Sequence, residues 1–386
     1  MPPSGDQSPS DAVGRPIHGD VLEAILSHLP LVHLVPTSIV SKVWNKGVAS
    51  TLKSKKPQPW FILHTQRSRS PYLTTTEAYD PGSRLWIEIH QPTIDYVSAL
   101  RSSQSNLLYM LSPSKFSFSF DPLHLTWHHV TPPRVWRIDP IVGVVGRHVI
   151  VAGGVSDFEH DPLAVEIYDL ESQIWTNPEP MPEFFEDSSS SIWTSIASDE
   201  RRLFVMEKSS GVLHTFDPLT KTWYGPFVLR PDHLVSHSSI GFSDDKLILI
   251  GLLVDSDDAT RIKLWEVNCE SFECHEIAEM PAAHVQKLKC DDMQIFSIDV
   301  RMAGNIAYIY KPMRGGEVIV CELFGDGGEC RWWSMANPVT GDRSIMERFV
   351  YTCTMVGVED LQRATGSMVN RRFRFRKMSN DVELQR

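Results

Sequence analysis

Paired cysteines, long apolar runs and a secretory leader are all missing from this sequence. The six cysteines lie in the last third of the chain without any CxxC pair, at Cys269, Cys274, Cys290, Cys321, Cys330 and Cys353. A chain of 386 residues can bury a core without covalent staples, so this pattern excludes a small disulfide scaffold. We expect reduced thiols, and therefore a cytoplasmic or nuclear protein.

No segment is suited to crossing a membrane as a helix. The most apolar stretch, 141–155, is interrupted by Arg147, His148 and four glycines, which leaves it too short and too polar to span the hydrocarbon layer. The opening residues, MPPSGDQSPSDAVGRP, lack the basic start and apolar core of a secretory signal. We therefore expect a soluble protein without a membrane partner.

An excess of basic residues is absent as well. The 37 lysines and arginines are outnumbered by 48 aspartates and glutamates, for a formal charge of −11, which makes general attraction to nucleic acid unfavourable. With 42% hydrophobic residues, the composition is that of an ordinary globular protein with a sizeable core. We expect a protein or small-molecule partner.

Signatures of common catalytic sites are missing too. The sequence contains no GxGxxG, GxxxxGK[ST], HExxH or GxSxG motif. Glu159-His160-Asp161 and His128-His129 are possible metal ligands, but adjacent residues of a strand point to opposite faces and do not easily reach one ion. We predict no catalytic residue, no metal and no cofactor.

The N-terminal region changes from polar to helical in character. Residues 1–15 offer almost nothing to bury and should be disordered. Between 17 and 48, Val21, Leu22, Ile25, Leu26 and Leu29 form one apolar stripe of helical period. Pro30 ends that helix, and a second apolar series follows it. About thirty residues bury too little to fold strongly alone, so this unit should need a partner.

The run PIHGDVLEAILSHLPLVHLVPTSIVSKVWNKGV, within 16–50, resembles an F-box, the motif that binds the Skp-type adaptor of SCF ubiquitin ligases. The resemblance departs from the usual pattern at Ile17, His33 and Pro36. The alternative is a small helical cap on the following domain. The resemblance implies that the adaptor contacts Pro16, Leu22, Ile25, Leu26, Leu29, Pro30, Leu34, Val40 and Trp44.

A repeat dominates the rest of the chain. All four aromatic-Asp dipeptides are followed by Trp six residues after the Asp, at Tyr79-Asp80 and Trp86, Phe120-Asp121 and Trp127, Tyr168-Asp169 and Trp175, and Phe216-Asp217 and Trp223. Four hits from four have a chance on the order of one in a million in an unrepeated sequence. We predict a hairpin, with the Asp in its turn and the two aromatic residues in the flanking strands.

Two degenerate copies, at Val267-Asn268 with Cys274 and at 321–324 with Trp332-Trp333, bring the number to six. Their spacing of roughly 41 to 58 residues is near the period of kelch repeats, which favours an all-β propeller of six four-stranded blades over 60–360. The segment RHVIVAGGV at 147–155 resembles the kelch strand that ends in a double glycine. The first blade lacks one strand, and 349–358 should supply it and close the ring.

The remaining segments are a linker at 51–59 and a basic tail at 361–386. The tail carries Arg371, Arg372, Arg374, Arg376 and Lys377 around two phenylalanines. Such a patch could bind nucleic acid or act as an import signal. The alternative is a solvated tail or an edge strand.

Together the motifs resemble those of plant kelch-repeat F-box proteins, which implies a non-catalytic substrate receptor of an SCF-type ubiquitin ligase with cullin and RING subunits. The segments LTWHHV, RVWRIDP and VAGGVSDFEHDP are similar to those of the family branch directed at chalcone synthase. Chalcone synthase or phenylalanine ammonia-lyase is therefore the expected target. A non-degradative scaffold and a kelch-propeller copper oxidase are the alternatives. Loops on one rim should hold the target through aromatic and Arg residues, Arg134, Trp136, Arg137, Phe158, Phe185 and Trp193.

Overall fold

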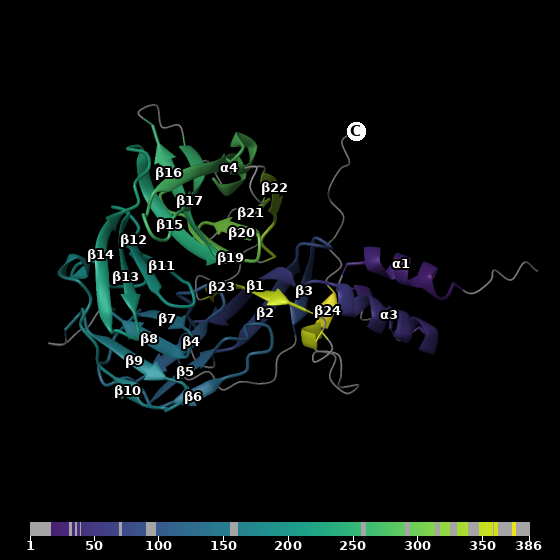
Figure 1. Ribbon diagram of the computed structural model, residues 1–386, viewed down its shortest axis with the longest axis horizontal. Helices are drawn as coiled ribbons and strands as arrows, with labels where there is room; N and C mark the ends of the chain where they lie inside the picture. The colour runs from purple at the N-terminus through teal and green to yellow at the C-terminus, as the bar shows by residue number, and fades with distance from the viewer. Residues whose placement is uncertain are drawn as a thin grey trace, which may run out of the picture.

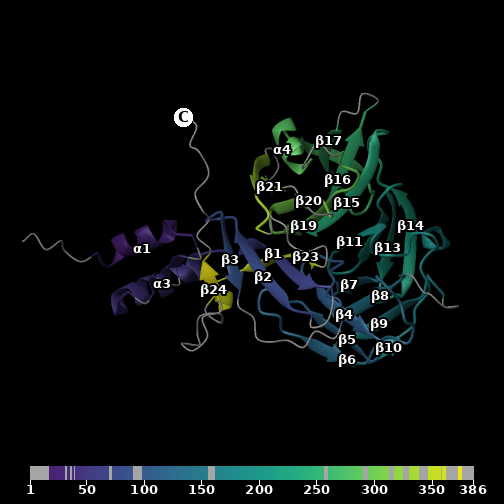
Figure 2. The ribbon, with the colours of Figure 1, turned by 180° about the vertical axis from the view of Figure 1, so that it is seen from behind.

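The computed structural model shows a six-bladed β-propeller with a helical unit at one side (Figure 1). In Figure 1 the six sheets follow one another around the ring, and α1 and α3 lie side by side beyond blade 1, as they also do from behind in Figure 2. The structure describes residues 17–30, 33–34, 37–38, 40–68, 72–89, 98–154, 161–255, 260–289, 294–312, 317–324, 330–338, 347–357, 359–361 and 373–375.

Blade 1 is built from both ends of the chain. From the inside of the ring outward its strands are β23 (Glu347–Val356), β1 (Gln58–Arg67), β2 (Thr74–Asp80), β3 (Leu85–Ile89) and β24 (Phe373–Phe375). The antiparallel pairing of β23 with β1 sets Phe61 opposite Cys353. The prediction that 349–358 supplies the missing strand is therefore confirmed, and the backbone of the tail forms an edge strand at 373–375.

The other blades follow in chain order. Blade 2 has three strands, β4 (Leu108–Ser112), β5 (Lys115–Ser119) and β6 (His128–Val130), and an isolated bridge from Arg101 to Tyr109 takes the innermost place. Blade 3 contains β7 (Ile141–Val145), β8 (His148–Ala152), β9 (Val165–Asp169) and β10 (Trp175–Thr176). Blade 4 contains β11 (Thr194–Ser198), β12 (Leu203–Glu207), β13 (Val212–Asp217) and β14 (Thr222–Val228). Blade 5 contains β15 (Val235–Ser243), β16 (Lys246–Val254), β17 (Thr260–Val267) and β18 (Cys274–Glu279). Blade 6 is β19 (Asp299–Ala303), β20 (Ile306–Tyr310), β21 (Val318–Leu323) and β22 (Cys330–Met335), while η1 (Glu183–Phe185) and α4 (Ala282–Leu288) lie in connections between blades.

The repeat occupies the outer hairpin of each blade. Tyr79 pairs with Trp86, Tyr168 with Trp175 and Phe216 with Trp223, as predicted, and the degenerate copies pair Val267 with Cys274 and Cys321 with Trp332. Blade 2 departs from the prediction because β6 begins one residue after Trp127.

The Asp of the repeat holds the turn. In blade 4 the Asp217 carboxylate accepts the backbone N–H groups of Leu219 and Thr220 at 2.8 and 3.3 Å. The residue four positions later has left-handed backbone in five blades, at Arg84, Leu125, Gln173, Lys221 and Phe272. Asp and Asn suit this place because their side chains mimic a turn of backbone.

Apolar clusters fill the seams between neighbouring blades. Phe61 and Trp86 of blade 1 pack with Tyr308 of blade 6, for example. The repeat Trp also ties the blades together, because the Trp175 indole donates to the carbonyl of Thr131 in the preceding connection at 3.1 Å. Trp86 and Trp223 make the matching bonds to Ala336 and Glu179.

The two ends of the inner strands define two faces of the ring. The turn face carries the turns after the innermost strands, including Gly146, Asp244 and Gly304, and a hollow of about 670 Å³ at the mouth of the central channel is lined by residues of all these turns. The loop face, at the opposite ends of the same strands, carries the connections between blades, such as 131–140, 177–193, and 280–289 with 294–298.

The double glycine is required by its surroundings. Gly153 and Gly154 have φ values of +63° and +95°. A Cβ on Gly153 would lie 2.2 Å from the carbonyl oxygen of Ser189, which enters from the next connection. Left-handed backbone and close approach thus coincide here, which only glycine tolerates.

The helical unit contains α1 (Asp20–His28) and α3 (Lys42–Ser54). Leu22, Leu26, Leu34 and Val48 are buried, and they belong to the same apolar cluster as residues of blade 1 such as Trp60. Gly47 permits the close approach of the helices, since a Cβ there would lie 3.1 Å from Leu26. Only 55–57 separate α3 from β1, so the linker is shorter than the 51–59 expected.

Candidate functional site

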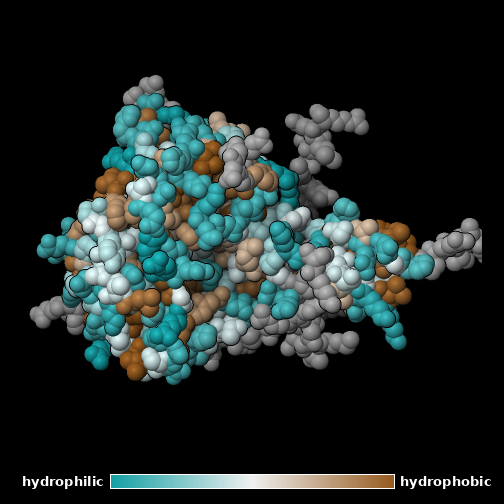
Figure 3. Space-filling view, in the orientation of Figure 1, coloured by the Kyte–Doolittle hydropathy of each residue, from teal (hydrophilic) through white to brown (hydrophobic). Residues whose placement is uncertain are grey.

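An exposed apolar surface covers the outer side of the helical unit. It consists of Ile17, Val21, Ile25, Val40 and Val43, which are 41 to 64% exposed; we call it the helical patch. Figure 3 shows apolar side chains at the end of this unit that points away from the propeller. A small helical unit that leaves five large apolar side chains in water has a surface suited to a protein partner.

The predicted adaptor-binding residues differ in how deeply they are buried. Ile25 and Val40 lie in the helical patch, whereas Leu22, Leu26 and Leu34 are fully buried and cannot contact a partner on this surface. Leu29, Pro30 and Trp44 are half-buried. Pro16 lies outside the described residues. The apolar periodicity predicted an apolar stripe on the helix, but it could not indicate which residues of that stripe face the propeller.

Two of the predicted target-binding residues are not on the surface. Arg137 lies in the core and forms an ion pair with Glu166, Nη2 to Oε2 at 2.8 Å. Burial lowers the pKa of Arg137, and the Glu166 carboxylate opposes that shift. Phe185 is fully buried in the seam between blades 3 and 4, with its ring 5.2 Å from that of His214.

The remaining predicted residues have different positions. Trp136 and Trp193 are exposed on the loop face, and Arg134 is exposed two positions before Trp136. Glu166 accepts the backbone N–H groups of Arg134 and Val135 at 2.7 and 3.2 Å, so the buried ion pair also fixes the loop that presents Arg134 and Trp136. Phe158 lies outside the described residues.

Three further apolar side chains of this face were not predicted. Phe184, Ile192 and Phe296 are 45, 59 and 73% exposed and come from connections between blades. All three lie outside the repeat positions, which is the signal that could have identified them. With Trp136 and Trp193 they form the rim patch, a set of large apolar groups on the face opposite the linker.

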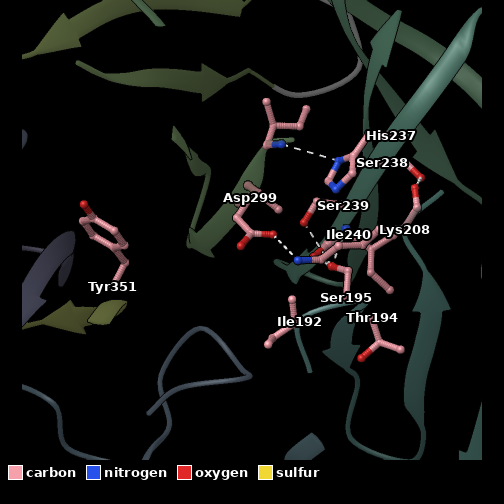
Figure 4. A network of polar contacts seen from close by, with 12 residues as sticks. Ile192, Thr194, Ser195, Lys208, His237, Ser238, Ser239, Ile240, Asp299 and Tyr351 are labelled. Carbon is pink, nitrogen blue, oxygen red and sulfur yellow. Dashed lines mark hydrogen bonds and ion pairs between the residues drawn. The ribbon is translucent and has the colours of Figure 1, made fainter. Parts of the chain in front are cut away.

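A polar network lies beside the rim patch, where the inner strands of blades 4 to 6 begin (Figure 4). The Lys208 ammonium contacts Asp299 Oδ1 at 2.7 Å, bridging blade 4 to blade 6. Ser195 and Ser239 join blades 4 and 5 through their hydroxyls at 3.0 Å. These bonds join blades 4, 5 and 6 at the loop face.

Burial and charge shift the pKa values of two groups in this network, Asp299 and His237. The Lys208 ammonium lowers the pKa of Asp299 although burial opposes the shift. Burial lowers the pKa of His237 to about 4, and its Nδ1 accepts the backbone N–H of Ile298 at 3.4 Å. His237 is neutral and accepts a backbone hydrogen bond, and Lys208 and Asp299 neutralise each other. These groups therefore have a structural role and not a catalytic one.

Among the residues that the structure describes, no three His, Cys, Asp or Glu side chains gather in a group that could hold a metal ion. None of the helices in the described ranges is long and apolar enough to cross a membrane.

Comparison with known proteins gives sequence relatives in one plant. The chain is 44% identical over 364 residues to the F-box/kelch-repeat protein At1g23390 of Arabidopsis thaliana, which covers 90% of this chain and 92% of that protein. A second Arabidopsis thaliana protein, At3g27910, provisionally named an F-box/kelch-repeat protein, is 28% identical over 118 residues, 31% of this chain and 29% of that protein. No family model matches the chain.

The solved structures with similar folds are more distant. Two proteins provisionally named 6-phosphogluconolactonases, from Bacteroides fragilis and Bacteroides uniformis, are each 12% identical, with TM-scores of 0.43 and 0.39. The alignments cover 75 and 76% of this chain and 83 and 100% of those chains. At this distance they carry no argument about function.

Proposed function

This chain belongs to the F-box/kelch-repeat proteins of plants, and on that basis we propose that it is the substrate receptor of an SCF-type ubiquitin ligase. Residues 16–50 form the F-box and bind a Skp-type adaptor, which links the chain to cullin and RING subunits. The propeller binds the protein to be degraded. The chain makes no covalent bond itself; it raises the effective concentration of target lysines near a charged ubiquitin-conjugating enzyme.

The observation that carries this proposal is the helical patch. Its five apolar side chains lie on a unit that projects from the propeller, so a partner can cover them without meeting the blades. The buried neighbours Leu22 and Leu26 meanwhile attach the unit to the apolar cluster that it shares with blade 1. Burying a large apolar side chain contributes about 1.5–3 kcal/mol, so covering these five would favour association with a partner.

Co-purification with a recombinant Skp-type adaptor tests the adaptor half of the proposal. We expect the double substitution Ile25→Asp and Val40→Asp to abolish recovery of the adaptor, because two carboxylates would have to be desolvated. The matched control is Leu219→Asp, since Leu219 is a 71% exposed apolar residue of the propeller. Undiminished recovery by the double variant would contradict the F-box assignment.

The target half of the proposal rests on the rim patch. It offers aromatic groups on the face away from the linker, with Arg134 in the same loop as Trp136, and these are residue types enriched in binding hot spots. The names of the relatives specify no target, so chalcone synthase and phenylalanine ammonia-lyase remain predictions.

Affinity capture with the full chain tests the target. The Ile25→Asp and Val40→Asp variant is the bait, because it should hold the target without delivering it for ubiquitination. Absence of both enzymes from the capture would contradict the flavonoid prediction. Capture that survives Trp193→Ala together with Arg134→Ala would instead place the target elsewhere on the propeller.

A further inference from the structure

A pocket lies on the turn face where blade 6 meets blade 1. Its volume is about 720 Å³, and its wall includes Lys56 of the linker, Arg84 of blade 1, and Arg331 and Trp333 of blade 6. We call it the junction pocket. This volume is within the range of small-molecule sites, about 300–1,000 Å³.

Trp333 organises the cations of the junction pocket. Its indole N–H donates to the Tyr79 hydroxyl at 3.1 Å, which fixes the ring across the seam. The guanidinium carbon of Arg84 lies 5.6 Å from the ring centroid, and that of Arg331 lies 5.8 Å from it. Stacking on a ring holds a guanidinium group in place while its N–H donors remain available to an anion.

The charges of the pocket are not balanced by its own carboxylates. Arg331 has Glu322 at 3.6 Å, but neither Lys56 nor Arg84 has an ion-pair partner among the described residues. Asp244 and Glu322 are the acidic residues in the lining. A cation already fixed in place loses little entropy when an anion arrives, which favours binding.

Apolar groups form the rest of the wall. Pro57, Pro59, Pro81 and Met355 line the same pocket, and Met355 also lines the hollow at the channel mouth. The junction pocket therefore combines anion donors with apolar walls.

We propose that the junction pocket binds a small organic anion, a carboxylate or phosphate carried on an apolar body. The charged group is held by Arg84 and Lys56, and the body lies against the prolines and Met355. Lys56 is two residues beyond the end of α3, so the ligand would contact the linker and both blades that close the ring. This site is separate from the helical patch and the rim patch, and it stands whether or not the chain is an SCF receptor.

Equilibrium dialysis with matched naphthalene probes tests the proposal on the full chain. Naphthalene-2-carboxylate and 2-naphthyl phosphate are the anions, and naphthalene-2-carboxamide is the neutral control. We expect at least one anion to bind with one-to-one stoichiometry, about tenfold more tightly than the amide, because a charge-assisted bond to Arg is the stronger contact. Which anion binds distinguishes carboxylate from phosphate.

Arg84→Gln assigns the binding to this pocket. Gln is suited to the position, because Gln173 holds the same left-handed place in blade 3. Lys221→Gln is the matched control, since Lys221 is the equivalent residue of blade 4. We expect the first variant to lose about tenfold in anion affinity and the second to bind as the wild type. Absence of anion binding at millimolar probe, equal binding of the amide, or wild-type binding by Arg84→Gln would overturn the proposal.

Discussion

Arg137 and Glu166 form an ion pair almost completely withdrawn from solvent, with side-chain exposures of 2% and 1%. Arg137 also donates to the carbonyl oxygens of Val151 and Ala164 at 3.2 and 2.7 Å. The pair therefore joins a loop of the loop face to the middle strands of blade 3. An Arg selected from sequence as a binding residue is a structural residue instead.

Removal of one partner of this pair should be severe. Arg137→Met leaves the Glu166 carboxylate buried without a counterion, and we expect a loss of about 3–5 kcal/mol in the free energy of unfolding, measured by urea titration. Arg137→Met with Glu166→Leu should recover part of that loss, because the lone charge is gone. A single variant as stable as wild type would contradict this account.

Trp175 should contribute less than a fully buried aromatic residue. Its side chain is half-buried, and its indole N–H donates to the carbonyl oxygen of Thr131. We expect Trp175→Ala to cost about 2 kcal/mol in unfolding free energy and Trp175→Phe about 1 kcal/mol, mainly the lost hydrogen bond. Equal stability of the Ala variant and wild type would show that this seam contributes nothing.

Two glycines of blade 3 separate backbone strain from steric overlap. Both Gly146 and Gly153 have positive φ, but the nearest atom to a new Cβ is 3.9 Å away at Gly146 and 2.2 Å at Gly153. Gly146→Ala should cost about 1–2 kcal/mol from conformation alone, and Gly153→Ala about 3 kcal/mol or more because Ser189 must move. Thermal denaturation of both variants checks the order, and the reverse order would contradict it.

His64 should make stability depend on pH. Burial lowers its pKa to about 3, so below the unfolded-state pKa of about 6.5 the unfolded chain takes up a proton that the folded chain does not. Stability therefore falls as pH decreases from 6.5 toward 3. At pH 5 this group alone costs about 2 kcal/mol relative to neutral pH. His64→Leu should reduce the loss measured between pH 7.5 and pH 5 by that amount, whereas an identical loss in both proteins would contradict the assignment.

The repeat could be predicted because its chemistry is local. Asp217 caps a turn two and three residues away, and Phe216 faces Trp223 across one hairpin. The turn and the cross-strand pair lie within a few positions, so spacing alone revealed six copies and hence the ring, whereas it did not reveal the bonds from the repeat Trp to distant connections. The short strand β6 and the single bridge at Arg101 in blade 2 could not be seen this way, because they depend on pairing and not on residue type.

The candidate site was harder to predict because burial depends on distant residues. Arg137 is buried by Glu166, 29 positions along the chain, and Phe185 by His214 of the next blade. No pattern near either residue carries that information. In the helical unit the stripe identified the apolar residues, but whether Leu26 or Ile25 is exposed depends on where the propeller lies.

Closure of blade 1 constrains how the chain is made. β1 pairs with β23, which lies almost 300 residues later in the sequence. During synthesis the inner edge of β1 therefore stays unpaired until about residue 356 has left the ribosome. An unpaired strand edge is a template for wrong pairing. A chain that stops before residue 347 would lack β23 and could not close the ring. Its helical unit would still be complete in sequence. Such an unclosed chain would itself be a candidate for degradation.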